Sequence, residues 1–311
     1  MNAGNAPLAR TFADRLRAGR FAMTAEVAPP VSCDAQDLLR KATPLRGLAD
    51  AVNLTDGAGA RAHMSALAAA TILLGAGIEP ILQITCRDKN RIALQSELMG
   101  AAALGVRNIL VLTGDHPKAG DQPDTKPVFD IDSKTLLQTA RRLRDERTLP
   151  TGREVAGKPS FFLGAADMPI DPPAGWQPTG LLGKVAAGAQ FAQTQFCLDA
   201  SVVRRYAGVL ADAGVTQQLA ILIGVNPLRS AKSAQWMKSH LFGTIIPDAL
   251  ITRMEKAADP AREGLRICVE LIEELATIPG IAGAHIMAPG NDAAIPEVIA
   301  AVRSRVQKAA V

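Results

Sequence analysis

Gln83-Ile84-Thr85-Cys86-Arg87-Asp88-Lys89-Asn90, followed by Asn108-Ile109-Leu110-Val111-Leu112-Thr113-Gly114-Asp115-His116-Pro117, decides the fold. Each stretch is a short apolar run that ends in polar residues, and a helical segment, 91–104, lies between them. The unit therefore predicts strand, helix, strand, with an aspartate just beyond a glycine where the second strand ends. In parallel α/β proteins, ligands bind at the carboxyl ends of the strands.

The same alternation continues along the whole chain. Short, nearly continuous apolar runs predict eight strands buried on both faces, at 21–27, 51–55, 80–85, 108–112, 160–164, 191–195, 219–224 and 284–287. Helical segments fall between them, at 34–46, 60–75, 91–104, 133–146, 179–187, 199–213, 230–240 and 248–276, with a last one at 293–307. This number of strands favours a closed (β/α)8 TIM barrel over an open doubly wound sheet. We expect one α/β domain over residues 1–311, with a short N-terminal extension of about residues 1–20.

Composition narrows the possible functions. Lys and Arg total 34 against 30 for Asp and Glu, without a basic cluster, which argues against nucleic acid as a partner. The four cysteines are far apart and the four histidines lack metal-ligand spacing, so we expect no metal site and a reduced, cytoplasmic setting. No stretch approaches the ~20 apolar residues of a membrane span, so we expect a soluble protein without a membrane partner. A homo-oligomer remains possible.

Glu26 is the first candidate for chemistry. It ends the first predicted strand and precedes Pro29 and Pro30, which stop the strand and stiffen the loop. A carboxyl group in apolar company at the barrel mouth has its charged form disfavoured, so it can hold a proton at neutral pH and act as a general acid. The alternative is a Glu26 that pairs with a neighbouring Lys or Arg.

Other polar residues follow the remaining strands. Gly114 lets backbone and ligand approach closely, and Asp115 after it either contacts a ligand or makes turn hydrogen bonds. Gln195 could form hydrogen bonds with the edge of a heterocyclic ligand, or it could be a satisfied polar residue that caps the barrel. Thr55 begins a Gly-rich segment before a helix, which is either a phosphate cradle or a turn. Of the histidines, only His116 is expected near the chemistry.

In this order and spacing, the Thr-Cys-Arg-Asp-Lys-Asn turn, the Leu-Thr-Gly-Asp-His-Pro loop, Thr194-Gln195-Phe196 and Glu26-Val27-Ala28-Pro29-Pro30 resemble the methylenetetrahydrofolate reductase family. The resemblance covers nearly the whole chain. It implies that Glu26 is the general acid, which protonates a folate nitrogen as the methylene bridge opens to an iminium. It also implies that Asp115 contacts the pterin and tunes the flavin, and that Gln195 binds the substrate.

For FAD, the resemblance implies contacts from Thr55, from Gly114 and Asp115, and from Lys184, which matches a lysine near the flavin phosphates. Gln83 stands where well-known members have a histidine at the flavin, and it is included among the cofactor residues. An Asp, an Asn and an Arg that bind the ribityl and phosphate groups in those members are missing from 177–183. We expect FAD to be weakly held, with Phe129 and Asp132 as candidates for replacement contacts. An aromatic residue that stacks on the nicotinamide or folate is replaced by Ala231.

The expected reaction is the reduction of 5,10-methylenetetrahydrofolate to 5-methyltetrahydrofolate by hydride from NADH or NADPH, through FAD. Two alternatives stay open. One is a direct hydride transfer from nicotinamide to a folate, without flavin. The other is a catalytically silent folate-binding or partner subunit. Absorbance in the flavin bands of the purified protein would distinguish the FAD-dependent reaction from both alternatives.

Overall fold

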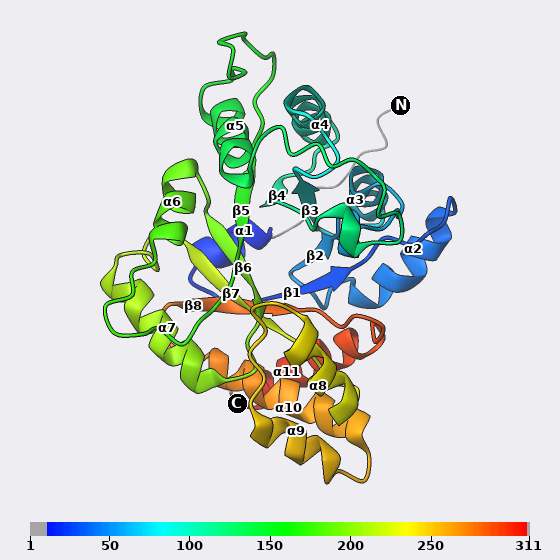
Figure 1. Ribbon diagram of the computed structural model, residues 1–311, viewed down its shortest axis with the longest axis vertical. Helices are drawn as coiled ribbons and strands as arrows, with labels where there is room; N and C mark the ends of the chain where they lie inside the picture. The colour runs from blue at the N-terminus through cyan, green and yellow to red at the C-terminus, as the bar shows by residue number, and fades with distance from the viewer. Residues whose placement is uncertain (1–10, 310–311) are drawn as a thin grey trace.

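The computed structural model describes residues 11–309, with side chains to residue 305. Within this range eight parallel strands pair in sequence order, and β8 returns to β1 to close a barrel. The strands are β1 (Ala22–Val27), β2 (Ala51–Leu54), β3 (Pro80–Thr85), β4 (Asn108–Leu112), β5 (Phe162–Asp167), β6 (Phe191–Phe196), β7 (Ala220–Val225) and β8 (Ile281–Ile286). The expected TIM barrel is therefore confirmed (Figure 1).

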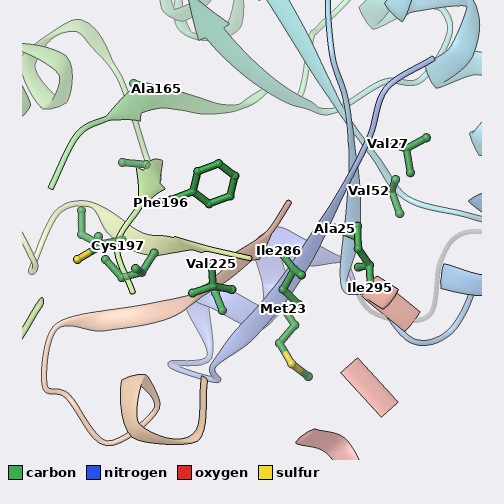
Figure 2. Close-up of a cluster of buried hydrophobic side chains, with 14 of the residues drawn as sticks. Met23, Ala25, Val27, Val52, Ala165, Phe196, Cys197, Val225, Ile286 and Ile295 are labelled. Atoms are coloured by element: carbon green, nitrogen blue, oxygen red, sulfur yellow. The ribbon is translucent and has the colours of Figure 1, made fainter. Parts of the chain in front are cut away.

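Helices form the outer ring of the barrel (Figure 1). They are α2 (Ala35–Ala42), α3 (Ala66–Gly75), α4 (Arg91–Ala103), α5 (Ser133–Asp145), α6 (Thr179–Ala187), α7 (Ala200–Asp212), α8 (Ala231–His240), α9 (Asp248–Glu255), α10 (Pro260–Leu275) and α11 (Ala294–Ala309). Short 3-10 turns lie at Thr43–Leu45, Ala58–Ala60 and Pro117–Ala119. Outward-facing strand residues pack against this ring; Figure 2 shows Ala25, Val225 and Ile286 together with Ile295 of α11.

Several boundaries differ from the sequence-based expectation. The helix expected at 60–75 begins only at Ala66, because Ala60 has a positive φ angle of 55° and Arg61 is extended. The helix expected at 248–276 is two helices, since Asp259 caps α10 and Pro260 starts it. The fifth strand continues to Asp167, where its end pairs with β6.

The floor of the barrel is closed by a helix that the sequence patterns did not reveal. Helix α1 (Phe12–Arg17) places Phe12 against Phe162 and Phe191, with ring centroids 5.8 and 5.3 Å away in edge-to-face geometry. The backbone N–H of Phe12 donates a hydrogen bond to the Glu79 carboxylate at 2.9 Å. Part of the expected N-terminal extension thus belongs to the barrel, and residues 1–10 lie outside the described residues.

Polar side chains occupy the barrel interior above this apolar floor. Strand side chains alternate between the two faces, so the inward positions of β1 are Ala22, Thr24 and Glu26. The middle layer contains Thr24, Asn53, Gln193 and His285, all buried. A packed TIM-barrel interior usually carries branched apolar residues, so a buried polar layer calls for a functional account.

Candidate functional site

The residues singled out from the sequence lie at one end of the barrel. Glu26, Gln83 and Gln195 are near the carboxyl ends of β1, β3 and β6. Thr55 directly follows β2, and Asp115 lies in the loop after β4. Because all the strands are parallel, these ends form one mouth. The structure therefore brings together five candidates that are far apart in the chain.

Glu26 has two polar neighbours from other strands. Its side chain is 23% exposed, and its Oε2 atom accepts a hydrogen bond from Gln83 Nε2 at 3.2 Å. The Nε2 atom of His285 lies 3.6 Å from the same oxygen. The ion pairs of the described residues include none between Glu26 and a Lys or Arg, so the alternative role as half of such a pair has no support.

Gln83 has a protein partner at the mouth, because its buried side chain donates to Glu26. Its expected contact with the flavin stays a prediction. An inward position on β3 beside β1 and β2 makes this contact possible, because barrel curvature brings side chains from nearby strands together. In the structure Gln83 is part of the environment of the candidate acid.

The buried layer beneath Glu26 was missed in the sequence. His285 Nδ1 lies 2.9 Å from Thr24 Oγ1 and 3.3 Å from Gln193 Nε2. Gln193 in turn forms a reciprocal amide pair with Asn53, with distances of 2.5 and 3.0 Å. One signal was available: each of these polar residues interrupts an otherwise apolar strand at an inward position.

The histidine beside Glu26 is His285, not His116. His116 is exposed, and its Nδ1 atom accepts a hydrogen bond from the backbone N–H of Lys118, which caps a 3-10 turn. His285, by contrast, is 2% exposed and lies against Glu26. Spacing along the chain could not distinguish them, since only barrel closure brings β8 beside β1.

The loop after β4 presents Asp115 to solvent at the mouth. Gly114 has φ +90°, and a Cβ atom there would come within 3.0 Å of Thr85 Cβ and 3.1 Å of Arg87 Cβ. Glycine is therefore required both by conformation and by space. The hydrogen bonds of the described residues include none from the Asp115 side chain, so the turn-forming role has no support. Its carboxylate is available to a ligand.

Thr55 carries a buried hydroxyl group with no hydrogen-bond partner. The loop after it is fixed to β3: Asp56 accepts hydrogen bonds from Thr85 N and Lys89 Nζ at 2.9 and 3.1 Å, and Arg87 Nη1 donates to the Gly57 carbonyl at 3.1 Å. A buried polar atom without a partner is rare and costs free energy. A bound ligand is one way to satisfy Thr55.

A second feature of the mouth is a cavity of about 320 Å³ between β4, β5, α5 and α6. Its polar lining includes Thr113, Ser133, Lys134, Thr179 and Lys184. Lys134 in the first turn of α5 and Lys184 in the last turn of α6 place two cationic side chains in this cavity, which favours an anionic ligand. The expected flavin-binding Lys184 is thus in a suitable cavity, although its Nζ also donates to the Ala166 carbonyl at 2.6 Å.

Asp132 and Phe129, the candidates for replacement contacts to FAD, each have protein partners. Asp132 is the N-cap of α5, and its carboxylate accepts a hydrogen bond from Thr135 N at 2.7 Å; the Thr135 hydrogen bonds lower the pKa of Asp132. Phe129 is half-buried with φ +39°, and its ring lies 6.4 Å from that of His116. Asp132 therefore has a structural role that needs no cofactor.

Three observations bear on metals, thiols and membranes. Across residues 11–309, no three His, Cys, Asp or Glu side chains lie close enough together to hold a metal ion. The four cysteines are free thiols. None of the helices in this part of the chain is both long and apolar enough to cross a bilayer.

Comparisons with known proteins agree on one family. The sequence profile described as methylenetetrahydrofolate reductase matches residues 11–303. A probable methylenetetrahydrofolate reductase (NADPH) of Caenorhabditis elegans is 26% identical over 242 residues, which is 74% of this chain and 33% of the relative. The chain therefore spans about a third of the length of this curated relative.

Solved structures share the fold. An uncharacterized protein from Clostridium thermocellum that binds two copies of 5-methyl-5,6,7,8-tetrahydrofolic acid superimposes with a TM-score of 0.66 at 13% identity, covering 92% of this chain and 97% of the other. A long-chain alkane monooxygenase gives 0.57 at 10% identity, covering 94% and 92%. At these identities the likeness concerns the barrel alone. The profile match over nearly the whole chain assigns it: the protein belongs to the methylenetetrahydrofolate reductase family.

Proposed function

We propose that this chain reduces 5,10-methylenetetrahydrofolate to 5-methyltetrahydrofolate with NADH or NADPH, using a loosely held FAD. The observation that carries the proposal is Glu26, a carboxyl group at the barrel mouth whose only described polar partners, Gln83 and His285, both lie on Oε2. Family membership supports folate reduction. The folate-binding structural relative supports a folate as ligand.

In this reaction one carbon–nitrogen bond breaks and one carbon–hydrogen bond forms. Glu26 gives its proton to the folate nitrogen that leaves the methylene carbon, and the carbon then accepts a hydride. The nicotinamide is oxidised as the one-carbon unit is reduced, and one proton is consumed for each hydride. General acids of this kind typically contribute ~10²–10⁴-fold to the rate.

Asp115 and Gln195 bind and orient the pterin. Asp115 has an exposed carboxylate that can accept hydrogen bonds and stabilise positive charge as the iminium develops. Gln195 lies in an irregularity of β6, where the register with β7 shifts between Gln193 and Phe196. Such bulges redirect side chains next to active sites. The Gln195 amide is partly used, because Oε1 accepts from Phe196 N at 3.0 Å and Nε2 lies 3.4 Å from the Phe242 carbonyl.

The residues present fit a flavin at the same mouth. Thr55 offers a buried hydroxyl group without a partner, and Lys134 and Lys184 line a cavity suited to a phosphate group. When bound, FAD would carry hydride from the nicotinamide to the folate. The missing polar trio in 177–183 is the reason to expect weak binding, since charged hydrogen bonds contribute ~1.5–3 kcal/mol each.

One preparation tests the proposal and its two alternatives. The absorbance spectrum of purified protein reports flavin, and turnover of NADH or NADPH with methylenetetrahydrofolate, with and without added FAD, reports the reaction. Turnover that rises with FAD supports the proposal. Turnover that is indifferent to FAD in a flavin-free preparation indicates direct hydride transfer. Folate binding without turnover in any condition indicates a silent binding subunit and overturns the proposed activity.

A further inference from the structure

Two side-chain nitrogen atoms lie close to the same oxygen atom of Glu26. Gln83 Nε2 lies 3.2 Å from Oε2 and His285 Nε2 lies 3.6 Å from the same Oε2. None of the hydrogen bonds among the described residues involves Oε1. The two oxygens of this carboxyl group are therefore in different environments, and the difference is created by side chains from two other strands.

The protonation of His285 follows from the buried layer beneath it. Gln193 Nε2, a donor only, lies 2.9 Å from Thr24 Oγ1 and 3.3 Å from His285 Nδ1. With this amide orientation, the Thr24 hydroxyl accepts from Gln193 and can donate to Nδ1, 2.9 Å away. If Gln193 instead donates directly to Nδ1, that atom is again an acceptor. In both arrangements a neutral imidazole carries its proton on Nε2, which faces Glu26, and this tautomer is the one on which the proposal below rests.

Gln193 is held from its other side as well. Its amide is paired with that of Asn53 through two hydrogen bonds of 2.5 and 3.0 Å, and both residues are at most 3% exposed. Two hydrogen bonds between buried amides keep both side chains in place. Hydrogen bonds from Asn53 to Gln193 and from Gln193 to Thr24 thus connect β2, β6 and β1 to Nδ1 of His285.

We propose that His285 and Gln83 are positioning residues for Glu26, which make Oε2 the acceptor oxygen and leave Oε1 as the atom that carries the proton to the substrate. Two N–H dipoles that point at Oε2 favour negative charge there and disfavour a proton on it. The proton then resides on the oxygen without a protein donor. Because Gln83 is neutral, it orients the carboxyl group without adding a cation that would hold the charged form. This inference rests on the proposed acid role of Glu26.

A double-mutant cycle tests whether both residues act through Glu26. Gln83→Met has nearly the same length but no donor, so we expect kcat for folate reduction to fall ~10-fold or more, as for loss of one oriented donor. The KM for the nicotinamide should not change. In a Glu26→Gln background the same substitution should have no further effect on kcat, because the carboxyl group that Gln83 positions is absent. Equal effects in both backgrounds would overturn the proposal.

His285 allows a rescue experiment. His285→Gln retains a nitrogen donor at the position of Nε2, whereas His285→Leu removes it, so the Gln variant should keep several-fold more of kcat. Equal losses in the two variants would indicate a packing role only. Gln217→Met, an exposed glutamine substitution on the connection before β7, is the matched control and should leave kcat unchanged.

A spectroscopic measurement keeps the inference separate from the activity. ¹⁵N NMR of the histidine-labelled protein should show His285 with a protonated Nε2 and an unprotonated Nδ1, and Glu26→Gln should shift the Nε2 signal alone. A proton on Nδ1 would contradict the proposal even in an active enzyme. An inactive wild-type protein with the expected tautomer would instead contradict only the proposed function.

Discussion

Lys184 Nζ donates a hydrogen bond to the carbonyl oxygen of Ala166 at 2.6 Å, at the end of β5. The same nitrogen lies 3.4 Å from a carboxylate oxygen of Asp167, whose other oxygen accepts a hydrogen bond from the Tyr206 hydroxyl group. An ammonium group has three N–H donors, so Lys184 can hold these contacts and still reach an anion in the adjoining cavity. It is the strongest remaining candidate for a phosphate contact.

Removal of this lysine should weaken FAD binding. We expect Lys184→Met to raise the Kd for FAD ~10–100-fold, which corresponds to one charge-assisted hydrogen bond. Flavin fluorescence titration measures it, and Lys158→Met, an exposed lysine on the connection before β5, is the matched control. An unchanged Kd would place the phosphates elsewhere. For the wild-type protein we expect flavin to be lost on purification and activity to rise when FAD is added.

Glu26→Gln should separate the two half-reactions. Folate and cofactor binding should persist, while folate reduction falls ~10²–10⁴-fold, because the amide cannot donate the required proton. Oxidation of NADH by an artificial acceptor involves no folate nitrogen and should survive. Stopped-flow measurement of each half-reaction checks both expectations. Near-normal folate turnover would remove Glu26 from the acid role.

Asp115→Asn should affect the folate more than the nicotinamide. An exposed carboxylate beside the pterin interacts with the substrate and with developing positive charge, so the Kd for folate and the folate half-reaction should worsen. Nicotinamide oxidation should change less. Equilibrium folate binding and single-turnover rates test this. If neither half-reaction responds, Asp115 is a loop residue without a functional contact.

Phe12→Ala should open the barrel floor. The ring is 1% exposed and contacts two other phenylalanines, so its loss should lower the free energy of unfolding by ~3–5 kcal/mol. Chemical denaturation measures the change. Phe242→Ala removes a ring that is 84% exposed and should stay within about 0.5 kcal/mol of the wild type. Equal effects of the two substitutions would mean that α1 does not seal the floor.

The cysteines should differ sharply in reactivity. Burial raises the pKa of Cys86 to about 11 and that of Cys197 to about 12, so both remain thiols at pH 8 and are shielded from reagents. Cys33 is exposed. Mass spectrometry after brief treatment with a thiol-specific alkylating agent at pH 8 should find one adduct, which Cys33→Ser abolishes. Labelling of Cys86 or Cys197 in the native protein would show that their surroundings open readily.

Most strands of the barrel could be predicted from the sequence for a simple physical reason. Parallel strands covered on both faces need apolar residues at nearly every position, and runs such as 80–85 and 108–112 show this directly. The positions of Glu26, Thr55 and Gln195 at strand ends follow from the same runs. Helix ends were harder to predict from the sequence. The periodic pattern predicted one helix at 248–276, whereas Pro260 begins a second helix in the structure.

The sequence by itself determined the strand order, the family and the polar residues that face the barrel mouth. Only the tertiary structure decided their partners. Closure of β8 onto β1 brings His285 to Thr24, 261 positions away in the chain, and to Glu26 beside it, while it leaves His116 in solvent. Side-chain alternation gives each residue a face, but the curvature and closure of the sheet determine which inward side chains meet. For that reason the contact between Gln83 and Glu26 could be found only in the folded barrel.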